Sequence, residues 1–134
     1  MGKVRFSDLV TVALLLAHGA VQAHHGTAGS YDQKQWVTIK GAVMEFRWRN
    51  PHSSLHLVRR DESGAESGYV IEMGSPNQMA KIGFTRDSMK PGDVIGIRVH
   101  PSFTNPGVGE NLTPDAITIN GKPVAFAALS PASR

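Results

Sequence analysis

Short runs of alternating apolar and polar residues, separated by turn residues, place the strongest constraint on the fold. Fourteen glycines and eight prolines divide the 134-residue chain into segments too short for long helices. No long stretch has the 3.6-residue periodicity of an amphipathic helix. Alternation with a period of two is typical of strands that bury one face. The sequence therefore predicts an all-β domain.

Turn residues separate six strand candidates. We expect strands over residues 36–48, 53–59, 69–73, 93–100, 116–120 and 123–126. Five or six short strands fit a small closed or partly open barrel of the oligonucleotide/oligosaccharide-binding (OB) type. A small β-sandwich is the alternative.

Four further expectations concern the interior of the first strand and the segments before and between the strands. Gly41 interrupts the first strand and predicts a bulge or a sharp bend there. Residues 76–90 predict a short helical insert after the third strand. Residues 101–114 contain three prolines and two glycines and predict a long loop, and residues 26–35 predict an exposed lead-in.

The N-terminus is predicted to be a secretory signal peptide. It has a basic start, an apolar run over residues 9–17, and small residues at Val21 and Ala23. Cleavage after Ala23 would remove residues 1–23 and leave a single domain, with flexible ends, over residues 24–134. The apolar run is shorter than the ~20 residues that span a membrane. We therefore expect a periplasmic or secreted protein with no membrane span after signal removal.

Composition excludes several classes of function. The chain has no cysteine, which excludes disulfides, a thiol nucleophile and a cysteine-ligated zinc site. The formal net charge is +3 and the basic residues are scattered along the chain, so no nucleic-acid partner is expected. No Gly-x-Ser-x-Gly motif or phosphate-binding glycine loop is present, so no hydrolase or nucleotide-binding chemistry is predicted.

Five histidines form the candidate metal site: His24, His25, His52, His56 and His100. Cleavage after Ala23 would give His24 a free α-amine, so this residue could offer a metal both the amine and a ring nitrogen. Copper(II) prefers such nitrogen ligands and heads the divalent affinity order. We hypothesise a copper site formed by His24 with the ring of His52, His56 or His100. The alternative is that these residues form a soluble leader and ordinary turns.

Three other residues have two interpretations each. Glu72 could accept a hydrogen bond from a metal-ligating histidine and so hold its ring, or it could simply face water. Trp48 and Tyr69 could line a ligand groove, or they could belong to the core, where aromatic residues of small β-domains usually lie.

Several motifs taken together resemble a family of small exported proteobacterial proteins known only as a domain of unknown function. The resemblance implies an exported β-domain and supplies no activity. Where members usually have a Leu-Arg-Asp-Gly-like stretch after the His-Pro pair, this chain has residues 102–107, Ser-Phe-Thr-Asn-Pro-Gly. The motifs are Ala23-His24-His25, Trp48-x-Asn50-Pro51-His52, Glu72-x-Gly74-Ser75-Pro76-Asn77, Lys90-Pro91-Gly92-Asp93 and His100-Pro101.

We therefore expect a periplasmic binding protein rather than an enzyme, with copper as its candidate cofactor. A metal-free ligand- or protein-binding module is the alternative, and a copper-dependent oxidase is the third hypothesis. The expected partners are a metal ion, a small molecule or a periplasmic protein.

Overall fold

The computed structural model describes residues 29–124. The predicted signal peptide, His24, His25 and the chain beyond residue 124 lie outside these residues. No helix within the described range is long and apolar enough to cross a membrane.

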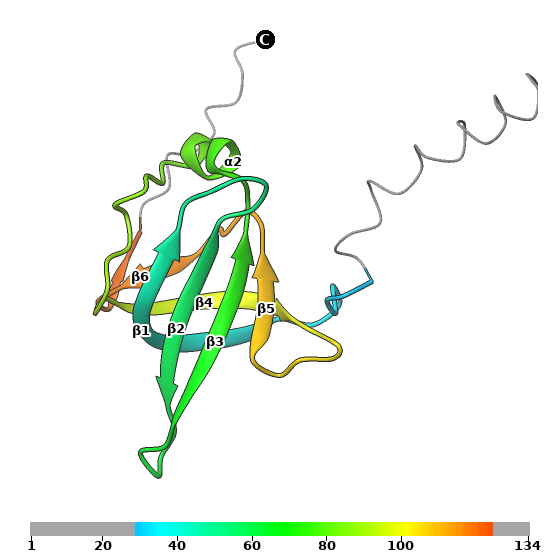
Figure 1. Cartoon of the computed structure of the whole chain (residues 1–134), viewed down its shortest axis with the longest axis vertical. Coiled ribbons are helices and arrows are strands. Elements are labelled where there is room, and N and C mark those ends of the chain that lie inside the picture. Colours follow the sequence, from blue (N-terminus) through cyan, green and yellow to red (C-terminus); the bar gives the residue numbers. More distant parts are fainter. Residues whose placement is uncertain (1–28, 125–134) are drawn as a thin grey trace, which may run out of the picture.

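Five strands close into a barrel (Figure 1). β1 pairs antiparallel with β2, β2 with β3, β5 with β4, and β4 with β1, while β3 and β5 are parallel. A five-stranded Greek-key barrel is the OB-type architecture, so the predicted barrel is confirmed and the β-sandwich alternative is not observed. The strands are β1 (Val37–Arg47), β2 (Ser54–Arg60), β3 (Glu66–Met73), β4 (Val94–Pro101) and β5 (Val108–Asn111).

β1 is long enough to belong to both halves of the barrel. Its residues 37–42 pair with β4, and residues 42–47 pair with β2. The register shifts between Val43 and Glu45, so the irregularity lies two to four residues beyond the predicted position. Gly41 has a different role: a Cβ there would lie 2.7 Å from the carbonyl oxygen of Val58. The glycine allows β1 to cross closely over β2.

The core follows from the period-two alternation of the strands. Inward-facing residues of β1 to β4 are buried, and their neighbours in sequence point outward. Residues of the insert after β3 add to the same cluster. Its members are Ile39, Val43, Leu55, Leu57, Tyr69, Ile71, Met73, Met79, Phe84, Met89, Ile95, Ile97, Val99 and Ile117.

A short helical insert follows β3, as predicted, and it covers one end of the barrel (Figure 1). It contains the short helix α2 (Pro76–Lys81), which Figure 1 shows above that end. Ser75 caps the helix by accepting from the backbone N–H of Gln78, and the Gln78 side chain accepts from the Ser75 N–H. This reciprocal capping box explains why the helix begins at Pro76. Met79 then points into the core.

Of the predictions about irregular segments, one is wrong and one holds only in part. The expected loop over residues 101–114 contains strand β5, whose short Gly-containing sequence has too little alternation to be recognised. The expected exposed lead-in is tied to the barrel: the Asp32 N–H donates to the Pro101 carbonyl (2.9 Å), and Tyr31 forms an isolated bridge with Ser102. Tyr31 is therefore buried, whereas residues 29, 30 and 33–35 are exposed as predicted.

A small hairpin completes the described chain. β6 (Ile117–Ile119) pairs with β4, and β7 (Lys122–Pro123) pairs with β6. Asn120 and Gly121 both have positive φ, as a two-residue hairpin turn requires.

Candidate functional site

A row of polar residues crosses the outer face of the barrel over four adjacent strands. Ser54 lies opposite Glu72, Glu72 opposite Glu110, and Glu110 opposite His100. Their sequence neighbours point into the core, so these side chains point outward. The lead-in crosses this face and brings the side chains of Tyr31 and Gln33 to the row.

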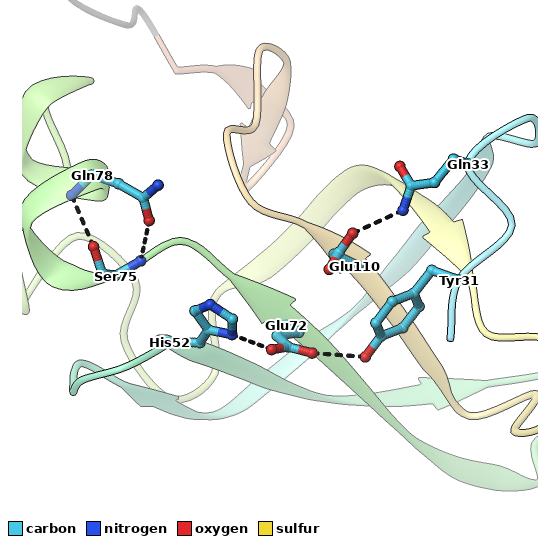
Figure 2. Close-up of polar contacts among 7 residues, drawn as sticks. All are labelled: Tyr31, Gln33, His52, Glu72, Ser75, Gln78 and Glu110. Atoms are coloured by element: carbon cyan, nitrogen blue, oxygen red, sulfur yellow. Dashed lines mark hydrogen bonds and ion pairs between the residues drawn. The ribbon is translucent and has the colours of Figure 1, made fainter. Parts of the chain in front are cut away.

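Glu72 joins the lead-in to the segment between β1 and β2. Its Oε1 is hydrogen-bonded to Nδ1 of His52, and its Oε2 accepts from the Tyr31 hydroxyl at 2.8 Å (Figure 2). The Glu72 and His52 side chains are 29% and 36% exposed, so the pair is reachable from solvent. One carboxylate therefore holds two side chains from segments far apart in sequence.

Tyr31 is kept as a hydrogen-bond donor. Burial raises the pKa of its hydroxyl, and the hydrogen bond to Glu72 and that residue's negative charge raise the pKa further. The hydroxyl consequently remains protonated and keeps donating to the carboxylate at any physiological pH.

His52 lies at the start of the stretch that leads into β2. The preceding Asn50–Pro51 peptide is cis, and the next residue, Ser53, is fixed against β3 by hydrogen bonds with Gly74 and Met73 (3.0 and 2.9 Å). The ring therefore stands on an anchored backbone. Its second nitrogen points away from Glu72 (Figure 2).

Glu110 lies beside this pair but is shielded from water. It is only 3% exposed, and its Oε1 accepts from Nε2 of Gln33 at 2.9 Å (Figure 2). Its Oε2 is buried without a hydrogen-bond partner among residues 29–124. The lead-in thus covers one carboxylate of the row and hydrogen-bonds the other.

His100 forms the far end of the row. Its Nδ1 lies 2.8 Å from the carbonyl oxygen of Gln35, which can only accept, so Nδ1 carries the proton. Its ring lies against Trp36 with centroids 3.7 Å apart, and the Arg98 guanidinium lies 5.0 Å from the centre of that indole. His100 is therefore held by the backbone carbonyl of Gln35, in the lead-in, and by the indole of Trp36, the next residue.

His56 lies on the outer face of β2 in a different environment. Its Nε2 is 3.1 Å from the Ser54 hydroxyl. Partial burial lowers the pKa of His56 and the nearby Arg47 charge lowers it further, while Glu45 raises it and Arg49 has the smallest effect, a lowering one. The neutral ring is favoured, and the cationic neighbours oppose a bound metal ion.

The predicted site residues are only partly brought together. Within the described part of the chain, His52 and Glu72 meet, whereas no group of three or more His, Asp or Glu side chains is placed to hold a metal ion. His24 and His25 lie outside it. Tyr69 is buried in the core with the Arg59 guanidinium 5.5 Å from its ring centre, and Trp48 packs edge-on against Phe46 at 5.7 Å. Tyr69 therefore occupies a core position, and Trp48 is partly buried against the core.

Sequence reasoning missed Tyr31, Gln33 and Glu110. Tyr31 was recognisable as the one large aromatic residue in an otherwise polar lead-in. Glu110 had no such signal, because its strand was predicted to be a loop.

Residues 12–109 match a family described as "Family of unknown function (DUF6152)". The chain belongs to this family. The DUF6152 match spans the lead-in, Glu72, His52 and His100, and it extends into β5. The predicted membership of a family known only as a domain of unknown function is thereby confirmed.

Among solved structures, this DUF6152 protein is similar to a mitochondrial single-stranded DNA-binding protein from S. cerevisiae, Rim1. The two share 12% sequence identity with a TM-score of 0.45, and the alignment covers 66% of this chain and 95% of Rim1. No curated protein matches the sequence.

Proposed function

We propose that this protein is an exported binding protein that holds copper(II) through the mature N-terminus and an outer-face histidine. The α-amine and ring of His24 would supply two nitrogens, and His52 would supply the third. The observation that carries the proposal is the hydrogen bond between Nδ1 of His52 and Glu72. Among residues 29–124, the other ring nitrogen of His52 has no hydrogen-bond partner.

The Glu72 contact suits a metal-ligating histidine. A carboxylate that accepts from one ring nitrogen fixes the proton there and leaves the lone pair on the other, and it also raises the basicity of the ligand. Tyr31 in turn holds Glu72 from the opposite side. Three linked side chains would thus orient one ligand nitrogen before copper arrives.

The lead-in would bring the mature N-terminus toward His52. Tyr31, whose hydroxyl contacts the same carboxylate as His52, lies seven positions after His24. An extended chain of seven residues spans roughly 23 Å. A span of that length would let His24 approach His52.

The other histidines rank below His52 as the third ligand. Nδ1 of His100 is also engaged, by the Gln35 carbonyl, but the His100 ring is packed against Trp36. His56 has its Nε2 beside Ser54 and two arginines nearby. His25 could assist from the position after His24.

Copper fits the available ligands better than other metals do. The chain has no cysteine, so imidazole and amine nitrogens are its strongest ligands. Binding is favoured over catalysis, since an oxidase would need an additional open coordination position for oxygen. A metal-free module would use the same outer face without the N-terminus.

The proposal includes an exported location and no nucleic-acid partner. A signal peptide over residues 1–23 would deliver the protein to the periplasm or beyond. There, the metal ion, a small molecule or another periplasmic protein would be its partner. The carboxylate of Glu72, which is reachable on the outer face, disfavours a phosphate backbone at this surface.

Three matched histidine variants test the ligand assignment. His52→Gln should lower copper(II) affinity by about tenfold or more, since a ligand is lost from a three-nitrogen set. His56→Gln and His100→Gln should change it by less than about threefold. Competition titration against a chelator of known affinity measures all three. Equal effects of the three substitutions would reject His52 as the specific ligand.

A further inference from the structure

A buried carboxylate oxygen within the polar row, between Glu72 and His100, lacks a donor. Glu110 is 3% exposed, and only its Oε1 is satisfied, by Gln33. Oε2 has no hydrogen-bond partner in the described chain, and Glu110 forms no ion pair there. An unpaired buried polar atom is costly, and a charged one is more costly still. This position therefore calls for a donor that the residues around it do not supply.

Glu110 lines a hollow large enough for a small organic molecule. The volume is about 350 Å³, within the range of small-ligand sites. The lining combines the carboxylate with an indole and an aliphatic side chain, and it comes from the lead-in, β4, β5 and the segment after β5. It includes Gln33, Trp36, His100, Glu110, Leu112 and Asp115.

The charge in this hollow is not balanced. Asp115 is paired with Arg98, its Oδ2 lying 3.1 Å from the guanidinium. Glu110 has no such cation among residues 29–124. A metal ion would find too few ligands, because no group of three or more His, Asp or Glu side chains surrounds it in that range. An organic cation needs only one carboxylate and an apolar wall.

We propose that this hollow binds a small primary ammonium compound that carries an apolar group. The ammonium donates an N–H to Oε2 of Glu110, which supplies the missing hydrogen bond and balances the charge. The apolar group lies against Trp36 and Leu112. This site is separate from the proposed copper site, since none of its ligand contacts involves His52 or Glu72.

Trp36 provides a direct reporter of the hollow. The chain contains two tryptophans, and Trp48 packs against the core away from this lining. Trp48→Phe therefore leaves Trp36 as the sole indole, 46% exposed at the wall of the hollow. Titrations of this variant, made with a chelator present to remove copper, follow only the proposed ligand.

The test compares n-butylamine hydrochloride with n-butanol, its neutral counterpart of equal chain length. The amine should give a saturable change in Trp36 emission with a dissociation constant on the order of 1 mM, as expected for so few atoms. Butanol should give none. Equal responses to the two compounds, or no response to the amine, would overturn the proposal and leave the position to water.

Glu110→Gln keeps the shape and the acceptor for Gln33 but removes the charge. It should weaken n-butylamine binding by about tenfold or more, because hydrogen bonds to charged groups contribute more than neutral ones. Asp115→Asn, in the same lining, should weaken it by less than about threefold. An unchanged dissociation constant in Glu110→Gln contradicts the proposal. If that variant does not fold, the comparison of amine with alcohol decides the question.

Discussion

Nδ1 of His52 and Oε1 of Glu72 are hydrogen-bonded across the junction between the β1–β2 connection and β3, while Tyr31 donates to the other oxygen of the same carboxylate. The lead-in, the connection and a barrel strand thus meet at one side chain. A change in Glu72 should consequently affect His52 more than the barrel, whose core lies on the opposite face of β3.

Glu72→Gln should weaken copper(II) binding by ~10–100-fold, the usual effect of losing the carboxylate that orients a ligating histidine. The physical reason is the loss of the negative charge that fixes the proton on Nδ1 of His52. Chelator competition measures the affinity. Glu45→Gln is the matched control, because Glu45 is an exposed carboxylate on β1 that contacts Arg47 at 2.7 Å. Unchanged copper(II) affinity in Glu72→Gln would show that Glu72 does not orient the copper ligand His52.

Gly41→Ala should destabilise the fold by about 1–3 kcal/mol, the usual cost of overpacking. Its Cβ would lie 2.7 Å from the Val58 carbonyl oxygen, and a backbone atom in a paired strand cannot move away easily. Gly68→Ala is the control, since that strand position has nothing within 4 Å of the added atom. Urea unfolding of both variants measures the difference. Equal stabilities would show that β1 and β2 can separate at no cost.

His56 should make the folded state sensitive to acid. Partial burial, followed by the charge of Arg47, lowers its pKa in the folded state below the unfolded value of ~6.5. Between the two pKa values the unfolded chain binds more protons, so the stabilisation is fully present above pH ~6.5 and is lost as the pH falls through the folded pKa.

Replacing His56 by Gln removes that contribution. The free energy of unfolding should therefore fall less between neutral and mildly acidic pH in His56→Gln than in the unsubstituted protein. Urea unfolding at a series of pH values measures the two slopes. A variant slope as steep as the original would assign the acid sensitivity to other groups.

The barrel was predictable because its strands carry their burial pattern in the sequence. Tyr69, Ile71 and Met73 alternate with outward residues, and a strand of this kind has one face to bury. Glu72 was recognisable for the same reason, as a carboxylate within an apolar strand. The sequence alone could not show its partners, since Tyr31 lies 41 residues away and His52 lies 20 residues away.

β5 was not predictable from local pattern. Its four residues include Gly109, where a Cβ would lie 2.6 Å from Val99 Cγ2, and Glu110, which is polar yet buried. The strand exists because β3 and β4 need a neighbour to close the barrel, and this requirement is tertiary. Because the β5 segment was predicted to be a loop, the burial of Glu110, the hollow beside it and the attachment of the lead-in to the barrel could not be predicted.

The exported protein should begin at His24. The basic start, apolar run and Val21-x-Ala23 sequence predict cleavage there. N-terminal sequencing of periplasmic protein, together with its intact mass with metals retained, measures both the cleavage site and any bound copper. An exported chain that still carries residues 1–23 would have no free α-amine on His24, and this would contradict the proposed copper site.

Adding a single residue before His24 shows whether the α-amine of that histidine binds copper. The extension keeps every side chain but moves the α-amine off the histidine, so it should weaken copper(II) binding about as severely as His24→Ala does. Binding by the unextended chain should also weaken as the pH falls below ~6.5, where free imidazoles become protonated. The measurement is copper(II) affinity of the two chains by chelator competition, with spin resonance to count nitrogen ligands. We predict a loss of affinity and of one nitrogen in the extended chain, and equal affinity in both would contradict the account.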